Sequence, residues 1–317
     1  MVEKPRIRNV FYIRGSGNLK YISLPTSVKR SNVYTPPCVI ALGFFDGLHI
    51  AHKALLMKAK KIAEEKQLQF AVMTFFPHPK HVLKQEGAPS SFITPPLEKR
   101  AYLKKIGVDL LYLVHFDLNV ASLSSQEFVN QYLINHQVNH IVAGFDFRYG
   151  NKGEGNIEIL KEQGKGFFDV TCVNEIKVNG VKISSTLIRQ WILEGQLENL
   201  QDSLGRSYTL EGKVISFSYS GASVKVDEMY LIPKSGFYNV EVIINGVSYP
   251  ALCKVFQDSR ELQLHFERSF SYYADNIIIG KVTFIKKLKD NSQVLDSNLD
   301  FINEMKVFSC ETRSFYK

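Results

Sequence analysis

Short apolar runs alternate with amphipathic stretches through the first two-thirds of the chain. The apolar runs predict strands over residues 38–42, 70–75, 110–116, 140–143 and 168–173. Between these runs, apolar residues recur at helical spacing and predict helices over residues 52–66, 96–106, 126–137 and 157–163. Strands that alternate with helices favour a parallel sheet flanked by helices, which is an α/β fold.

End signals support two helices in this region. The helix near residue 126 follows Ser124 and has Glu127 three residues later, which is a capping-box pattern. A last helix over residues 186–193 starts after two serines and ends before Gly195. Both helices therefore have a defined start in the sequence.

From about residue 209 the pattern changes to short β-rich runs. Strands are predicted over residues 210–219, 238–244, 247–255, 261–266 and 277–285. Asn245 and Gly246 form a strong hairpin-turn signal between two of them. We therefore expect a first domain over residues 1–203 and a smaller antiparallel β-barrel over residues 204–317.

Composition narrows the class of protein. The 317 residues are 45% hydrophobic and 22% charged, which is typical of a globular protein, and no apolar stretch approaches membrane-spanning length. The net charge of +8 comes from lysines and arginines spread along the chain, so we expect no nucleic-acid partner and no membrane partner. The scattered cysteines Cys38, Cys172, Cys253 and Cys310 favour free thiols and a cytoplasmic location.

The most informative chemistry lies in the turn after the first predicted strand. Gly43-Phe44-Phe45-Asp46-Gly47-Leu48-His49 leads from that strand into a helix, an arrangement suited to phosphate binding. His49 and His52 stand three residues apart, so the first helical turn places both imidazoles on one face. They suit a nucleotide triphosphate better than zinc, because no third or fourth metal ligand follows nearby.

Four motifs in order resemble those of prokaryotic FAD synthetases, which are usually fused to a riboflavin kinase. The first is the turn at Gly43–His52, similar to the family's G-x-F-D-G-x-H-x-G-H. The others are Phe76-Pro77-His78-Pro79, then Gly144-Phe145-Asp146-Phe147-Arg148-Tyr149-Gly150, and finally Ile183-Ser184-Ser185-Thr186-Leu187-Ile188-Arg189. Leu204-Gly205-Arg206 stands where the family passes into its kinase half. The resemblance implies a Rossmann-like nucleotidyltransferase domain followed by a riboflavin-kinase-type barrel.

The resemblance also implies a reaction, in which the phosphate of FMN attacks the α-phosphorus of ATP to give FAD and pyrophosphate. Alignment and charge neutralisation dominate such a transfer, and Mg²⁺ is the expected cofactor. Catalytic roles are expected for His49, His52, Ser185, Thr186 and Arg189. Substrate or cofactor binding is expected for Gly43, Phe45, Asp46, Gly47, His78, Asp146, Arg148 and Lys182, with Asp146 also a metal ligand.

The chain departs from the family pattern in three places. Ala51 replaces the second glycine of H-x-G-H and narrows the approach to the phosphates. In the family's kinase half, a P-T-A-N motif binds Mg²⁺ and ATP phosphates. This chain has no such motif, and its stretch from Ser220 to Val226 has a different sequence. Gln263 stands where the kinase has a glutamate base, and an amide cannot accept a proton as a carboxylate does. We therefore expect FMN adenylyl transfer without riboflavin phosphorylation.

Three other functions stay open at this point. The chain could be a bifunctional kinase and synthetase with an unusual kinase site. It could be another H-x-G-H nucleotidyltransferase, although the P-H-P and D-F-R-x-G frames argue against that. It could be a non-catalytic flavin-binding protein, against which the retained histidines and the I-S-S-T-x-I-R frame argue. A homo-oligomer is also left open.

Overall fold

The computed structural model describes residues 19–24, 35–85, 90–218, 221–266 and 279–288. The chain forms two compact units, each treated separately below. Unit 1 comprises residues 1–190, 200–206 and 228–231, and unit 2 comprises residues 191–199, 207–227 and 232–317. Among the described residues, no helix is long and apolar enough to cross a membrane.

Unit 1 is built on a six-stranded parallel sheet. Its strands are β1 (Lys20–Leu24), β2 (Cys38–Leu42), β3 (Gln69–Phe76), β4 (Leu110–His115), β5 (Val138–Gly144) and β6 (Asp169–Val173). All five residues of β2 are buried, because helices cover both faces of the sheet at its centre. The α/β expectation is therefore confirmed.

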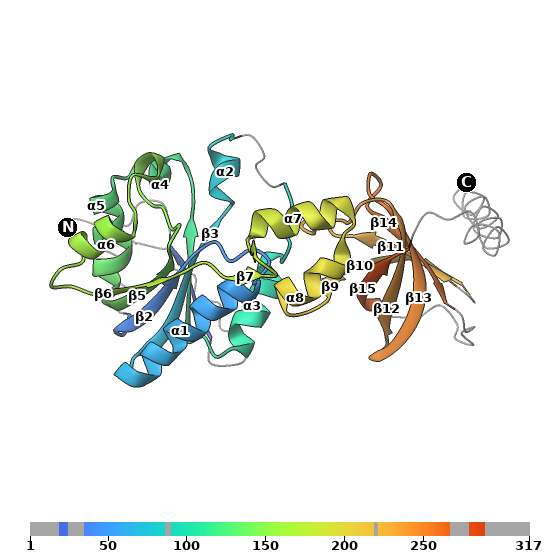
Figure 1. The fold of residues 1–317 in the computed structure, drawn as a ribbon, viewed down its shortest axis with the longest axis horizontal. Coiled ribbons are helices and arrows are strands. Elements are labelled where there is room, and N and C mark those ends of the chain that lie inside the picture. Colours follow the sequence, from blue (N-terminus) through green and yellow to red (C-terminus); the bar gives the residue numbers. More distant parts are fainter. Residues whose placement is uncertain (1–18, 25–34, 86–89, 219–220, 267–278, 289–317) are drawn as a thin grey trace, which may run out of the picture. The chain divides into compact units, whose positions relative to one another are not determined.

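Helices lie on both faces of this sheet (Figure 1). On one face, Leu56 and Ala59 of α1 (Ile50–Lys66) and Leu103 of α3 (Pro96–Lys105) pack on the buried side chains of the strands. On the other face, Phe128 at the end of α5 (Ser125–Phe128) and Leu160 of α6 (Ile157–Gln163) belong to a second core. The remaining helices are α2 (Pro79–Val82), α4 (Leu118–Ser122), α7 (Ser185–Glu194) and α8 (Leu200–Leu204).

The strand order decides where a ligand can enter. The order is β1-β4-β3-β2-β5-β6. After β2 the chain adds β3 and β4 on one side of β2, and it then crosses back to add β5 and β6 on the other side of β2. Neighbouring connections leave β2 and β5 toward opposite faces, which opens a crevice beyond their carboxyl ends. Gly43 follows β2 and Asp146 follows β5, so both expected binding loops start at this crevice.

Unit 2 is an antiparallel sheet in the order β10-β11-β14-β13-β12-β15-β9. Its strands are β9 (Tyr208–Leu210), β10 (Gly212–Phe217), β11 (Gly221–Val226), β12 (Gly236–Ile244), β13 (Val247–Phe256), β14 (Glu261–Phe266) and β15 (Ile279–Lys287). The two edge strands, β9 and β10, are separated in the sequence only by Glu211. A sheet whose edges are joined by one residue must curl, and the result is a curled half-barrel sheet.

The expected boundary after residue 203 stays a prediction, because the two units interleave along the chain. Residues 228–231 lie in the second half of the sequence but pack with unit 1. There the N–H of Phe92 donates to the carbonyl of Met229, at 2.7 Å, and the N–H of Leu231 donates to the carbonyl of Phe92, at 2.8 Å. A parallel bridge thus joins Phe92 to Tyr230.

Several predicted elements match the structure and a few differ. The strands at 38–42 and 261–266 and the helix at 157–163 have the predicted bounds, and Ser124 and Glu127 form the predicted capping box. The predicted helix over 126–137 is not one α-helix: after α5 it continues as a π turn over Val129–Leu133 and a 3₁₀ turn over Ile134–His136. Strands β1 and β11 were not predicted; β1 is a short edge strand and β11 is rich in small residues.

Three of the cysteines, Cys38, Cys172 and Cys253, are unpaired in the described part of the chain, and Cys38 and Cys253 are buried. Cys310 lies outside the described residues, as do Tyr219, Ser220 and the start of the strand predicted at 277–285.

Buried His136 gives unit 1 a pH-dependent stability. Its side chain is completely buried, neither ring nitrogen has a hydrogen-bond partner among the described residues, and burial lowers its pKa to about 4. Between pH 6.5 and pH 4 the unfolded chain binds a proton there that the folded chain does not, so stability falls as the pH falls.

We expect His136→Leu to reduce this loss of stability, because leucine has a similar volume and carries no titrating group. The measurement is the urea midpoint by far-UV circular dichroism at pH 7 and pH 5. The difference between the two midpoints should be smaller in the variant than in the unmodified protein. His81→Leu, at an exposed position of α2, is the matched control and should leave that difference unchanged. An unaltered difference in His136→Leu would contradict the prediction.

Candidate active site

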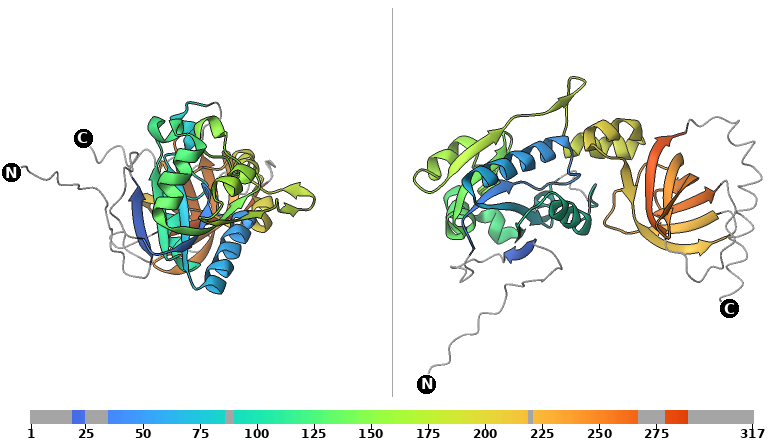
Figure 2. Two further views of the ribbon diagram at one scale, coloured as in Figure 1. Left: turned by 90° about the vertical axis from the view of Figure 1, so that its left-hand side faces the viewer. Right: turned by 90° about the horizontal axis from the view of Figure 1, so that it is seen from below.

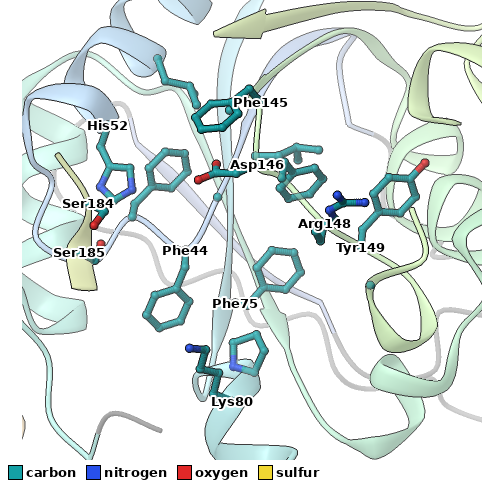
Figure 3. Close-up of a pocket in the computed structure, with 18 of the residues that line it drawn as sticks. Phe44, His52, Phe75, Lys80, Phe145, Asp146, Arg148, Tyr149, Ser184 and Ser185 are labelled. Atoms are coloured by element: carbon teal, nitrogen blue, oxygen red, sulfur yellow. The ribbon is translucent and has the colours of Figure 1, made fainter. Parts of the chain in front are cut away.

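A cavity of about 1200 Å³ lies in unit 1 at the carboxyl ends of β2 and β5. In Figure 3, His52, Ser184 and Ser185 lie on one side of the cavity and Arg148 and Tyr149 on the other, with Asp146 between them. Among the residues expected to act, those that line the cavity are Gly43, Phe45, His49, His52, Asp146, Arg148, Lys182, Ser185 and Thr186. Asp46, Gly47, His78 and Arg189 are not among its lining residues.

The turn after β2 has a backbone that requires its glycines. Gly47 has a φ of +84°, where a side chain is strained. A Cβ atom at Gly43 would lie 2.9 Å from the Phe45 ring, a distance that real Cβ atoms do not show. Phe45 and Leu48 also have positive φ angles, of 54° and 46°. The turn is therefore held in an uncommon conformation, as is frequent at ligand-binding sites.

His49 and His52 form a stacked pair at the start of α1. Their ring centroids are 3.6 Å apart with an interplanar angle of 17°. His49 is the N-cap residue of α1, and its Nδ1 accepts the backbone N–H of His52 at 3.3 Å. Because Nδ1 accepts, a neutral His49 carries its proton on Nε2, where it can donate to a ligand.

Both imidazoles are neutral at physiological pH. Burial lowers the pKa of His49 to about 4; the charge of Asp146 opposes this shift and that of Arg206 adds to it. Burial, together with His49 and Lys99, holds the pKa of His52 well below its usual value. Nδ1 of His52 is buried without a hydrogen-bond partner among the described residues. The pair thus offers uncharged donors rather than fixed positive charge.

Asp46 lies beneath the cavity and joins three segments. Its side chain is 3% exposed; Oδ1 accepts the N–H of Thr94 at 3.0 Å, and Oδ2 accepts the N–H of Ile93 at 3.3 Å. Oδ2 also accepts Nη2 of Arg189 at 2.8 Å, while the Asp46 carbonyl accepts the Ser185 hydroxyl at 2.8 Å. Asp46 and Arg189 thus form an ion pair that joins α7 to the turn, with the Asp46 side chain buried and the Arg189 side chain 18% exposed. Their expected contact with substrate stays a prediction.

The start of α7 has the hydroxyl groups that the sequence suggested, in distinct roles. Ser184 accepts the N–H of Leu187 at 3.3 Å and so caps the helix. Ser185 contacts the turn through Asp46, and Thr186 is exposed in the cavity wall. Helix capping alone therefore accounts for Ser184 but not for Ser185 or Thr186.

Asp146 and Lys182 form an ion pair in the cavity lining. Nζ of Lys182 lies 3.3 Å from Oδ2 of Asp146 and 4.4 Å from the centroid of the Phe145 ring. Lys182 belongs to the hairpin of β7 (Lys177–Val178) and β8 (Val181–Lys182), which projects from unit 1 in both views of Figure 2. The Asp146 side chain is 63% exposed, so it is free to take other partners.

The far wall of the cavity is aromatic. Phe75 contacts Phe116 and Phe128 with ring centroids 6.2 and 6.3 Å apart, and Tyr149 contacts Phe128 at 5.4 Å and Phe147 at 5.8 Å. We call this cluster, together with Phe44, the aromatic wall; all six residues line the cavity. Arg148 is exposed beside it. The wall suits a flat apolar ring system.

His78 has a structural environment. It caps α2 by accepting the N–H of Lys80 at 3.1 Å, and its ring lies 4.2 Å from that of Phe44 in an edge-to-face arrangement. Burial lowers its pKa to about 4. The expected contact of His78 with a flavin stays a prediction; His78 does not line the cavity, whereas Phe44, which its ring contacts, does.

Two cations at the site, the buried Lys99 and the partly buried Arg206, were not expected from the sequence. Nη2 of Arg206 donates to the carbonyl of Gly47 at 3.0 Å and to the Thr94 hydroxyl at 2.9 Å. Nζ of Lys99 donates to the carbonyl of Phe44 at 2.6 Å. Arg206 was recognised only as part of a motif, and Lys99 carried no signal because it is one of several basic residues in its helix.

Comparison with known proteins agrees with this geometry. Residues 31–187 match the family model described as FAD synthetase. The chain is 41% identical over 238 residues to the bifunctional riboflavin kinase/FMN adenylyltransferase of Listeria monocytogenes, covering 71% of this chain and 76% of that protein. It is 32% identical over 234 residues to the FAD synthetase of the same organism, covering 74% and 93%.

A solved structure is similar over nearly the whole chain. It is described as a macrolide-efflux protein from Streptococcus pneumoniae, with a TM-score of 0.75 and 29% identity, covering 90% of this chain and 98% of that one. The family model spans the glycine turn, the Asp146 loop and the start of α7, which are the segments that form the cavity. From this coincidence of matched segments and site, together with the identity to both Listeria proteins, the chain belongs to the FAD synthetase family.

Proposed function

We propose that unit 1 is an FMN adenylyltransferase, which transfers AMP from ATP to FMN and releases pyrophosphate. The observation that carries the proposal is the meeting, in one cavity, of a capped histidine pair with an aromatic wall. The first suits phosphates at a helix N-terminus, and the second suits an isoalloxazine ring. The names of both Listeria relatives include this chemistry or its product.

The reaction needs no protein nucleophile. A phosphate oxygen of FMN forms a bond to the α-phosphorus of ATP, and the bond from that phosphorus to the bridging oxygen of pyrophosphate breaks. The FMN phosphate is already ionised, so no proton has to be removed from it. The protein contributes alignment and donors to the oxygens that gain charge.

The neutral histidines supply such donors. Nε2–H of His49 is directed by the cap contact at Nδ1, and the stacked His52 lies beside it at the helix N-terminus. Thr186 and Lys182 add a hydroxyl and a cation at the cavity wall. Asp46, Arg189 and Ser185 hold the turn and α7 in register, which preserves the distance between these donors.

One carboxylate in the cavity lining is suited to hold Mg²⁺. Among the described residues no group of three metal-ligating side chains exists, so this part of the chain offers no complete cage. Mg²⁺ bound with a nucleotide commonly uses one or two carboxylates with phosphate oxygens and water. Asp146 is an exposed carboxylate in the cavity lining and would be the ligand, and the ion would neutralise phosphate charge.

We also propose that unit 2 does not phosphorylate riboflavin. Gln263 lies in β14, in register with Ser223 of β11 and Lys254 of β13. Leu262 and Leu264 are buried, so Gln263 shares the partly exposed face with Glu261. The nearest carboxylate in that strand is therefore displaced by two residues from the position of the expected base.

The first test is direct. Purified protein incubated with FMN, ATP and Mg²⁺ should form FAD and pyrophosphate in equal amounts, measured by chromatography and a coupled pyrophosphate assay. Omitting the metal should abolish product. Absence of both products at high enzyme concentration would rule the proposal out.

The histidine pair gives the second test. We expect His49→Ala and His52→Ala each to lower kcat by about 100-fold or more, since loss of one donor to developing charge typically costs ~2.7–4 kcal/mol. Steady-state kinetics at pH 7.5 measures this, and His81→Ala, an exposed histidine of α2, is the matched control. Unchanged turnover in both site variants would assign the pair a structural role only.

The third test concerns unit 2. Riboflavin and ATP should give no FMN under conditions where the same preparation converts FMN to FAD. Gln263→Glu should not restore FMN formation, because a carboxylate base cannot replace a missing metal and phosphate site. FMN formation at a rate similar to FAD formation would instead support a bifunctional enzyme, as in the Listeria relative named for both activities.

A further inference from the structure

Lys99 is a lysine buried in the support of the active site. It lies in α3, and only 5% of its surface is exposed, whereas Lys104 and Lys105 of the same helix are exposed. Lysine is rarely buried to this degree, because removing an ammonium group from water is costly. Burial lowers the pKa of Lys99 to about 8, although the charge of Asp46 opposes the shift.

The contacts of this ammonium converge on one residue. Nζ donates to the carbonyl of Phe44 at 2.6 Å and lies 4.5 Å from the centroid of the Phe44 ring. Among the described residues no carboxylate forms an ion pair with Lys99. The charge is therefore not retained for a salt bridge, and its attractive contacts are a charge-assisted hydrogen bond and a cation–π contact to Phe44.

Phe44 is the point where the glycine turn meets the aromatic wall. Its carbonyl also accepts the Thr74 hydroxyl at 2.9 Å, so two donors fix its backbone. Its ring lines the cavity between the ring of His78, 4.2 Å away, and that of Phe92, 6.2 Å away. In Figure 3, Phe44 and Phe75 both lie below Asp146. A cation held against both the carbonyl and the ring restrains both ends of this residue.

We infer that Lys99 is a positioning residue for the flavin substrate: its ammonium group holds Phe44 in the cavity wall against which FMN binds. This inference rests on the proposed adenylyltransferase function. Lys99 does not line the cavity, so it acts through Phe44 and not by touching the substrate.

The substitution Lys99→Met separates this role from a structural one. Methionine matches the length of the side chain but removes the charge and the donor. We expect the Kd for FMN, measured by flavin fluorescence without ATP, and the KM for FMN to rise about tenfold, as for loss of one charge-assisted hydrogen bond. Because the wall contacts ground and transition states alike, kcat should change less than about twofold, and the KM for ATP likewise.

The thermal stability of Lys99→Met should not fall, although its affinity for FMN does. An apolar side chain at this site avoids the cost of burying an ammonium group, so the Tm of Lys99→Met should be equal to or higher than that of the unmodified protein. Lys105→Met, at an exposed position of the same helix, is the matched control and should alter neither FMN affinity nor Tm. Lys99→Gln, which keeps a donor but no charge, should have intermediate FMN affinity.

The pH profile gives a further readout. The groups whose charges interact with Lys99 are Asp46, His52 and His78, and both histidines are neutral above pH 7. As the pH rises from 7 to 9, Lys99 loses its proton and the KM for FMN should rise in the unmodified protein. The same pH change should leave the already raised KM of Lys99→Met nearly constant.

Unchanged FMN affinity in Lys99→Met would overturn the inference, and so would a fall in Tm that accompanies a parallel loss of kcat. Failure of the proposed function is a separate result: the unmodified protein would then make no FAD from FMN and ATP. The fluorescence measurement needs no turnover, so it tests the role of Lys99 in either case.

Discussion

The ion pair between the buried Asp46 and the partly buried Arg189 is the interaction on which the site depends. Buried charges stabilise a structure only when every oxygen is satisfied, because desolvation otherwise exceeds the Coulombic gain. Here Oδ1 accepts one backbone N–H, and Oδ2 accepts Arg189 and a second N–H. The contacts join residues 93–94 and the start of α7 to the turn after β2. Removing either charge would leave the other buried and three segments without their common attachment.

Side chains also bind the backbone carbonyls along the turn after β2. The carbonyl of Phe44 accepts Lys99 and Thr74, that of Asp46 accepts Ser185, and that of Gly47 accepts Arg206. With its carbonyls bonded to side chains behind it, the turn is fixed without any ligand. The histidines that follow remain neutral because burial lowers the pKa of both, and one cation acts in the same direction on each, Arg206 on His49 and Lys99 on His52. Lys99 and Arg206 thus support the turn, while the neutral histidines and the cation Lys182 line the cavity.

The sequence predicted the sheet, the glycine turn and the histidine pair because each depends on local pattern: an apolar run, residues with positive φ, and a spacing of three at a helix start. The sequence could not distinguish residues that contact a ligand from residues that support those contacting residues. Asp46 and Arg189 belong to the motifs yet do not line the cavity, and their partners lie 47 to 143 residues away in the chain. Lys99 was missed for a similar reason, since amphipathic spacing does not reveal which lysine of a basic helix faces inward. In unit 2, strand β11 was missed because it begins with the small residues Gly221, Ala222 and Ser223, which give little apolar pattern, and its order comes from pairing with β10 and β14.

The division of the chain into units bears on the site as well. Residues 228–231 follow β11 in the sequence but belong to unit 1, where their backbone pairs with Phe92. The N–H groups of the next two residues, Ile93 and Thr94, are those that bind the Asp46 carboxylate. The segment that supports Asp46 is therefore itself held by backbone from the second half of the chain. A single cut after residue 203 would remove that support and also Arg206, which binds Gly47 and Thr94. Whatever chemistry unit 2 performs, the sequence that encodes it also encodes part of the framework of the first active site.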